Sequence, residues 1–251
     1  MAGLELRPRS GTELIDASFN FVRANYAPLI GMIALAQLPF VAASLMLPVS
    51  PDEIVKFWTA HVPQVVVGYV VAIWWWAVMG CAFVLLTADL IEGHPANLAS
   101  ALTRALRRGF AAGAAVVLKY LVIWLWMLLF FLPGLWAFAR YFAVVPALAI
   151  ENLGPLAAIR RSKELARGAS GLIIAVAGLP ILAYLVLANI IQQTLLTLGG
   201  YSVLVRAIAT LTSTLLYPFA AMPGILLYYD MRIRREGLDI QIDAAFPTAA
   251  A

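Results

Sequence analysis

The sequence predicts an all-α integral membrane protein with six transmembrane helices that form three hairpins, each preceded by a cytoplasmic amphipathic helix at the membrane interface. The first observation is composition: 63% of the 251 residues are hydrophobic and 12% are charged, whereas soluble domains carry about 25% charged residues. The second is that the apolar residues gather in runs long enough to cross about 30 Å of hydrocarbon. The third is that the bases lie between these runs, as orientation signals do.

Six apolar runs have the length, or nearly the length, of a transmembrane helix. They cover about 24–47, 65–88, 110–131, 132–150, 171–194 and 203–227. The fourth run is the shortest and contains Arg140, so a re-entrant segment is the alternative to a full span. Pro180, Pro218 and Pro223 should kink the last two spans. We expect one transmembrane domain over 1–237, a flexible cytoplasmic tail over 238–251, and short outer loops at about 48–64, 132–134 and 195–202.

The positions of the bases favour six spans over five. With six spans, 13 of the 17 Lys and Arg residues fall on one side of the membrane, and Lys56 alone falls on the other. With five spans, the bases between 160 and 167 would face outward, against the positive-inside rule. We therefore expect both termini in the cytoplasm. The first 23 residues mix acids and bases, so no cleaved signal peptide is expected.

A short amphipathic helix is expected before each hairpin, because charged residues recur there with a helical period. The first follows Ser10, which has capping-box spacing to Glu13. The interfacial bases of the other two are Arg104, Arg107, Arg108, Arg160, Arg161, Lys163 and Arg167. Acids recur where the return spans end, at Asp89, Glu92, Glu151 and Asp230. An acid close to the start of the next interfacial helix interacts favourably with the positive end of its dipole. These charges either anchor helix ends or form a surface that recognises lipid or a partner.

Three bases lie inside the predicted spans, where an ionisable residue is unfavourable by about 2.5–3.5 kcal/mol and therefore indicates function. They are Lys119, Arg140 and Arg206. Arg140 and Arg206 each lie six residues after an outer-turn glycine, so we expect them at one depth in the outer half of the membrane. A guanidinium suits a phosphate, which makes the three bases candidates for an anion- or lipid-binding site. The alternative is that each side chain extends to the outer interface. Neighbouring polar candidates are Asn189, Gln192 and Gln193.

Two further motifs concern helix packing. The three tryptophans at 74–76 lie in the middle of a span, where packing bulk is the expected role and a ligand-facing aromatic wall is the alternative. Gly109 and Gly113 form a GxxxG pattern at the start of the third span. This pattern lets a neighbouring helix approach closely.

The sequence contains no recognised catalytic or metal-binding motif. His61 and His94 fall on opposite sides of the membrane and Cys81 is the single cysteine, so no zinc-type cluster is expected. Phosphate-binding loops and nucleophile elbows are also missing. We expect no catalytic residue, no metal and no cofactor. The bases form no soluble basic face, so we expect no nucleic-acid partner.

The chain resembles a bacterial six-span membrane family over nearly its whole length. The resemblance is carried by the stretches LRPRSGTELIDASFNFVRANYAPLI, LPGLWAFARYFAVVPALAIENLGPLAAIRRSKELARG and LLYYDMRIRREGLD. The family is labelled glycerophosphoryl diester phosphodiesterase membrane domain, or of unknown function, and the resemblance implies a bacterial cytoplasmic (inner) membrane. Phosphodiesterase relatives carry their chemistry in a fused soluble barrel with a His-Arg dipeptide. Neither His61 nor His94 is followed by Arg, so the resemblance implies no such activity.

The leading hypothesis is a non-enzymatic, multi-pass inner-membrane protein that binds or organises lipid, or a membrane partner, through its basic amphipathic helices. Its expected partners are membrane lipids, anionic ones among them, a membrane protein, or a second copy of the chain. The alternative is a transporter or permeation path for an anionic amphiphile that uses Lys119, Arg140 and Arg206. An intramembrane enzyme is a third hypothesis.

Overall fold

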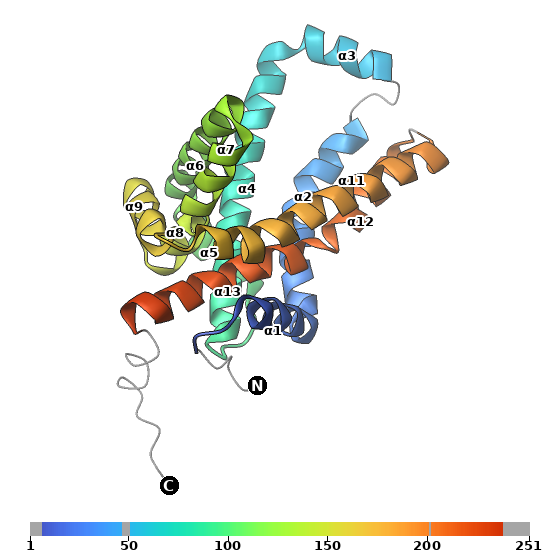
Figure 1. Ribbon diagram of the computed structural model, residues 1–251. Coiled ribbons are helices and arrows are strands. Elements are labelled where there is room, and N and C mark those ends of the chain that lie inside the picture. The colour runs from blue at the N-terminus through green and yellow to red at the C-terminus, as the bar shows by residue number, and fades with distance from the viewer. Residues whose placement is uncertain (1–6, 47–50, 201, 238–251) are drawn as a thin grey trace.

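The computed structural model describes residues 7–46, 51–200 and 202–237, and this part of the chain is helical, with no strand (Figure 1). The helices are α1 (Gly11–Ala24), α2 (Tyr26–Met46), α3 (Pro51–Ala60), α4 (Val62–Ile91), α5 (Leu98–Leu106), α6 (Gly109–Leu129), α7 (Phe131–Arg140), α8 (Val144–Ile150), α9 (Pro155–Leu165), α10 (Ser170–Ile173), the π-helical segment η1 (Ile174–Gly178), α11 (Leu179–Gly199), α12 (Val203–Thr214) and α13 (Tyr217–Glu236).

Six helical stretches of the described chain are long and apolar enough to cross a membrane, as predicted. They are Tyr26–Ala43, Val62–Ile91, Gly109–Leu129, Phe131–Ile150, Ser170–Gly199 and Val203–Glu236. The fourth has the length and composition of a span, although its sequence left a re-entrant segment open. The all-α class and six helices of spanning length are therefore confirmed for the described residues. The predicted tail over 238–251 lies outside them.

Two predicted outer connections differ from the structure. The expected loop over 48–64 contains α3, which begins at Pro51, because proline suits the first position of a helix. The expected turn at 132–134 lies earlier, at Phe130, whose extended backbone separates α6 from α7. Gly134 instead lies in the first turn of α7, where a Cβ would come within 2.9 Å of the Met127 Cα. Pro51 therefore begins a helix, and Gly134 allows α7 to lie close to α6. The predicted position of the turn, 132–134, was wrong.

Three of the six stretches are not continuous α-helices. The fourth is broken at 141–143, the fifth contains η1, and the sixth is broken at 215–216. Pro180 and Pro218 follow the last two irregularities, each in the first turn of the next α-helix, because a proline cannot donate a backbone hydrogen bond. The expected disturbance of the last two spans is thus found at these two positions, whereas Pro223 lies inside α13.

The GxxxG pattern of α6 receives an aromatic ring and not a helix backbone. Trp74 of α4 lies against Gly109 and Gly113, and a Cβ added to these glycines would come within 3.0 Å and 3.1 Å of the ring. Such distances are shorter than ordinary contacts between carbon atoms, which lie near 3.5–4.0 Å. Close packing is therefore the role of both glycines, and the indole is the group that uses it.

The other two tryptophans of α4 also pack against neighbouring helices. The Nε1 of Trp75 donates to the carbonyl of Ala36 in α2 over 2.9 Å. The ring of Trp76 lies 5.7 Å from that of Phe40 in α2 and 6.1 Å from that of Tyr217 in α13. The packing interpretation of the tryptophan run is thus supported, and α4 packs against α2, α5, α6 and α8.

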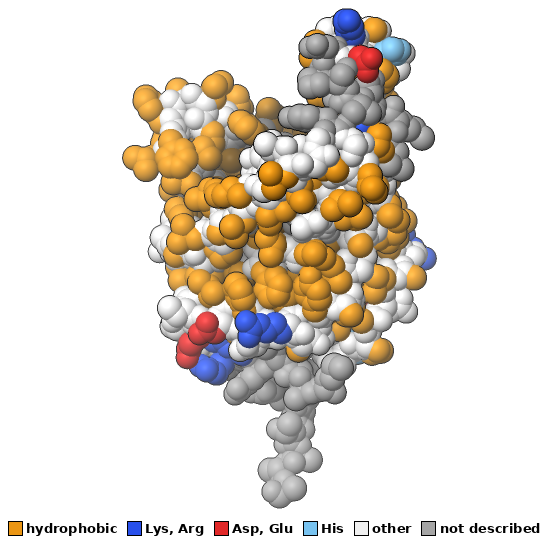
Figure 2. Space-filling model, turned by 90° about the vertical axis from the view of Figure 1, so that its right-hand side faces the viewer, with side chains coloured by type: hydrophobic (Ala, Val, Ile, Leu, Met, Phe, Trp, Pro, Cys, Tyr) orange, Lys and Arg blue, Asp and Glu red, His pale blue; other side chains and the backbone are white. Residues whose placement is uncertain are grey.

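The helices converge at one end of the molecule and diverge at the other (Figure 1). We call the part formed by α1, α5, α9 with the joint that precedes it, and residues 228–236 of α13 the basic end. The opposite end consists of α3 and of the turns that join α6 to α7 and α11 to α12. Figure 2 shows one face of the molecule with hydrophobic side chains over its middle and charged side chains below them. Most residues from 77 to 91 are buried, whereas most from 62 to 73 are exposed.

Candidate functional site at the basic end

Three short helices of the basic end begin with local sequence signals. Before α1, the Ser10 hydroxyl accepts from the Glu13 N–H (3.3 Å) and the Ser10 N–H donates to the Glu13 carboxylate (2.8 Å), so the predicted capping box is present. The Ser10 N–H is the main reason that the pKa of Glu13 is lowered. Before α5, the Asn97 side chain accepts from the Ser100 N–H (2.9 Å). In α9 the first residue is Pro155, which fits that position.

The same two positions of each of these helices face the interior. The fourth and eighth residues are buried in all three: Leu14 and Ser18 in α1, Ala101 and Ala105 in α5, Ala158 and Ser162 in α9. Residues four apart lie on one face of a helix, and most of these side chains are small, so α5 and α9 lie close to the spans they accompany.

An arginine of α5 and one of α9 each pair with the acid that ends the preceding span. In α5, Arg104 forms an ion pair with Asp89, at the end of α4. In α9, Nε of Arg161 lies 2.9 Å and 2.8 Å from the two carboxylate oxygens of Glu151, directly after α8. Both arginines are the seventh residue of their helix. The two acids were expected to face a helix dipole, but their partners are side chains almost two turns further along.

The Glu151 carboxylate is also the centre of a wider network that reaches α13. The Tyr228 hydroxyl donates to it over 2.6 Å, and Nε of Arg232 lies 3.8 Å away. Glu236 in turn pairs with Arg161 and, over 3.3 Å, with Arg232. The hydrogen bond to Glu236 is the main reason that the pKa of Arg161 is raised. The four charged side chains are only 16–25% exposed, and their charges balance, as partly buried ions require.

A second acid of α13 joins the two ends of the described chain. The Asp230 side chain is 2% exposed and accepts from Nε of Arg234 over 2.6 Å. It also accepts from the backbone N–H of Arg9 over 2.8 Å, and Arg234 donates to the Arg9 carbonyl. The segment before α1 is therefore held against α13, and the first and last helices lie at the same end of the molecule.

The seven predicted interfacial bases separate into two groups. Besides the two arginines paired with acids, Arg108 donates to the Leu148 carbonyl, and the Lys163 ammonium lies 5.1 Å from the centre of the Tyr141 ring. These four side chains bind the protein itself. The other three are exposed, and no ion pair of their side chains occurs within the described ranges: Arg107, Arg160 and Arg167.

The structure places the three predicted in-span bases on three different helices. Lys119 of α6 lies 5.3 Å from the ring centre of its neighbour Tyr120, and the Arg140 guanidinium lies 4.6 Å from that of Trp136 in the same helix, α7. Arg206 belongs to α12, which packs against α2 and α11. The shared anion site of these bases stays a prediction. The polar candidates of α11 are exposed: Asn189, Gln192 and Gln193.

Several residues of the network were not predicted from the sequence. The sixth span was expected to end at 227, whereas α13 continues to Glu236. The signal was present in the spacing, because Tyr228, Arg232 and Glu236 are four residues apart and share one helix face. Ser162 carried no comparable signal, since its hydroxyl bonds to backbone groups of a distant turn.

Comparison with protein-family models, with curated proteins and with solved structures finds no match to this chain. The family resemblance of the three quoted stretches therefore stays a prediction. Within the described residues, no group of three or more His, Cys, Asp or Glu side chains lies close enough to hold a metal ion. What the structure defines is a helical protein of six membrane-length helices with a charged, internally paired end.

Proposed function

We propose that this chain is a non-enzymatic, multi-pass protein of the bacterial cytoplasmic membrane that binds and organises anionic lipid at its basic end. The observation that carries the proposal is the division among the interfacial bases. Arg104 and Arg161 are neutralised by acids of the protein, whereas Arg107, Arg160 and Arg167 are exposed and lack such partners in the described chain. Exposed bases at the level of headgroups each favour an anionic membrane surface by about 1 kcal/mol.

In this proposal the six spans form three hairpins, and α1, α5 and α9 lie in the cytoplasmic interface ahead of them. Their buried fourth and eighth residues face the spans, and the ion pairs hold α5 and α9 in place. Both termini are cytoplasmic, because most bases lie at the basic end. An ordered basic surface of this kind holds lipid headgroups without any catalytic group.

The contact of Ser162 with the broken fourth span revises the expected depth of Arg140. The Ser162 hydroxyl donates to the Arg140 carbonyl (2.9 Å) and accepts from the Ala143 N–H (3.1 Å). With α9 in the cytoplasmic interface, Arg140 lies nearer the basic end than its distance from the outer turn predicts. It then differs in depth from Arg206, which weakens the idea of one site that contains both.

The alternative function, a permeation path for an anionic amphiphile, needs Lys119, Arg140 and Arg206 along one passage. The three bases come from different helices, and two of them lie on aromatic rings of their own helices. Lipid binding at the basic end does not require these three bases to line one passage, and we therefore favour it.

Retention of phosphatidylglycerol by the full chain in detergent tests the proposal, with phosphatidylcholine as the neutral comparison and native mass spectrometry as the readout. We expect preferential retention of phosphatidylglycerol, weakened about fivefold by Arg160→Gln, since about 1 kcal/mol is lost. Lys56→Gln is the matched control, because Lys56 is also exposed but lies on α3, beside an acid at 53. Equal retention of the two lipids, or equal loss in both variants, would contradict the proposal.

A further inference from the structure

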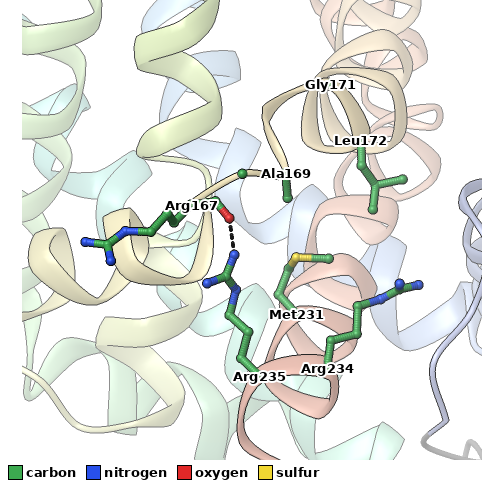
Figure 3. Close-up of a pocket in the computed structure, with 8 residues that line it drawn as sticks. Arg167, Ala169, Gly171, Leu172, Met231, Arg234 and Arg235 are labelled. Atoms are coloured by element: carbon green, nitrogen blue, oxygen red, sulfur yellow. Dashed lines mark hydrogen bonds between the residues drawn. The ribbon is translucent and has the colours of Figure 1, made fainter.

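A pocket of about 520 Å³ opens at the basic end between α13 and the segment that joins α9 to α10. Figure 3 shows Arg234 and Arg235 of α13 on either side of Met231, with Ala169 and Leu172 above them. The volume exceeds that of a single water molecule, whose share of liquid volume is about 30 Å³, many times over. The pocket is therefore large enough for a small polar group together with several carbon atoms.

Two guanidinium groups flank the pocket and keep donors for a ligand. Arg235 donates to the Arg167 carbonyl, and Arg234 donates to Asp230 and to the Arg9 carbonyl. A guanidinium has five N–H donors in a fixed plane, so each group retains donors after these bonds. Both side chains are exposed. The protein bonds fix the arginine positions, which lowers the entropy lost on binding an anion.

Among the described residues, no carboxylate lines the pocket. The two acids of α13 near these arginines are already paired. Asp230 is 2% exposed and bonds to Arg234 and to a backbone N–H, and Glu236 pairs with Arg161 and Arg232. Arg235 has no ion-pair partner in the part of the chain that the structure describes. The pocket therefore carries an excess of positive charge and favours an anion.

The floor and roof of the pocket are apolar. Met231 is 3% exposed, and Ala169 and Leu172 are partly buried. A guanidinium pairs with phosphate oxygens in a planar, two-point geometry, whereas the methionine and leucine side chains suit carbon atoms next to such an anion. An anion attached to a carbon skeleton meets both requirements.

We infer that this pocket binds one phosphate group of an anionic amphiphile, with Arg234 and Arg235 paired to the phosphate oxygens and Met231 and Leu172 against the adjoining carbon atoms. The inference rests on the proposed function for the supply of lipid at this end. The phosphate comes from a lipid headgroup or from a free phosphate compound, and the test below separates these sources.

Two variants of the full chain alter the pocket in different ways. Arg235→Gln removes one guanidinium and leaves the Asp230 contacts intact. Gly171→Glu places a carboxylate at the pocket, where an added Cβ meets nothing within 4 Å, and an acid in the first turn of a helix is favourable. We expect both to weaken phosphatidylglycerol retention about tenfold, as the loss of a charge-assisted hydrogen bond predicts. Gly171→Gln, of equal size and no charge, should retain the lipid.

The source of the phosphate follows from a second measurement on the wild type. If sodium phosphate raises the melting temperature above that in sodium chloride of equal ionic strength, and Arg235→Gln abolishes the rise, the pocket takes free phosphate. Retention of phosphatidylglycerol without that rise identifies a lipid headgroup. Wild-type binding in Arg235→Gln and Gly171→Glu, or equal loss in Gly171→Gln, would overturn the inference. If Arg160→Gln still weakens retention in that case, the pocket inference fails but the proposed function stands. If the wild type does not prefer phosphatidylglycerol to phosphatidylcholine, both fail.

Discussion

At the basic end, four charged side chains and a tyrosine join α8, α9 and α13, whereas the turns at the opposite end expose large apolar side chains such as Leu128, Phe130 and Leu198. The spans differ in the same way. In their apolar windows, 56% of the residues of the second and fourth spans are buried, but only 17% of those of the fifth. Lipid is as apolar as leucine, so exposed leucine carries no penalty in a bilayer and drives little helix association. Specific contacts must therefore supply the order, and they concentrate at the basic end.

The largest effect on stability is expected from Glu151→Gln, because this carboxylate is the centre of the charged network at the basic end. The substitution keeps the size of the side chain but leaves Arg161 and Arg232 with Glu236 as their one acidic partner among the described residues. Breaking a partly buried ion pair should lower the free energy of unfolding by about 3 kcal/mol. Denaturant unfolding in detergent micelles measures it. Glu92→Gln is the control, since that side chain is 56% exposed and should change stability by less than about 0.5 kcal/mol.

An intermediate effect is expected from matched glycine substitutions in the spans. Gly113→Leu meets the Trp74 ring, whereas Gly68, at the sparsely packed end of α4, has no atom within 4 Å of an added Cβ. Overpacking at Gly113 should lower the stability by about 2 kcal/mol. Gly68→Leu should leave it unchanged or raise it slightly, because leucine is the better helix former. Equal melting temperatures for the two variants would show that the two regions do not differ in packing.

The smallest effect concerns pH and the capping box of α1. Because the Ser10 N–H lowers the pKa of the Glu13 carboxyl, the ionised form stabilises the folded state above the ordinary value of 4.5. This contribution is lost as the pH falls through the lowered pKa. Glu13→Gln keeps a capping-box residue but does not titrate. We expect the wild type to melt slightly above the variant at neutral pH, and this difference to disappear in acid as the wild type loses the contribution of the ionised carboxylate. An unchanged difference between the two melting temperatures at every pH would show that ionisation of Glu13 does not stabilise the protein.

The features that were predictable from the sequence are those that depend on neighbouring residues. Apolar runs gave the six helices of spanning length, and Ser10 with Glu13 gave the start of α1. Features that depend on packing were not predictable. Tyr228 and Glu151 are 77 residues apart in the chain, and their hydrogen bond exists because α13 crosses the α8–α9 joint. The pocket beside Arg235 likewise needs two segments that are distant in sequence.

The proposed function requires that the basic end face the cytoplasm and the opposite end face outward. Single cysteines test it in a Cys81→Ala background, with Ser100→Cys in α5 and Thr197→Cys in α11, since both positions are exposed. A membrane-impermeant maleimide should label Thr197→Cys in intact spheroplasts and should label Ser100→Cys only after permeabilisation. Labelling of Ser100→Cys in intact spheroplasts, with Thr197→Cys protected, would contradict this orientation.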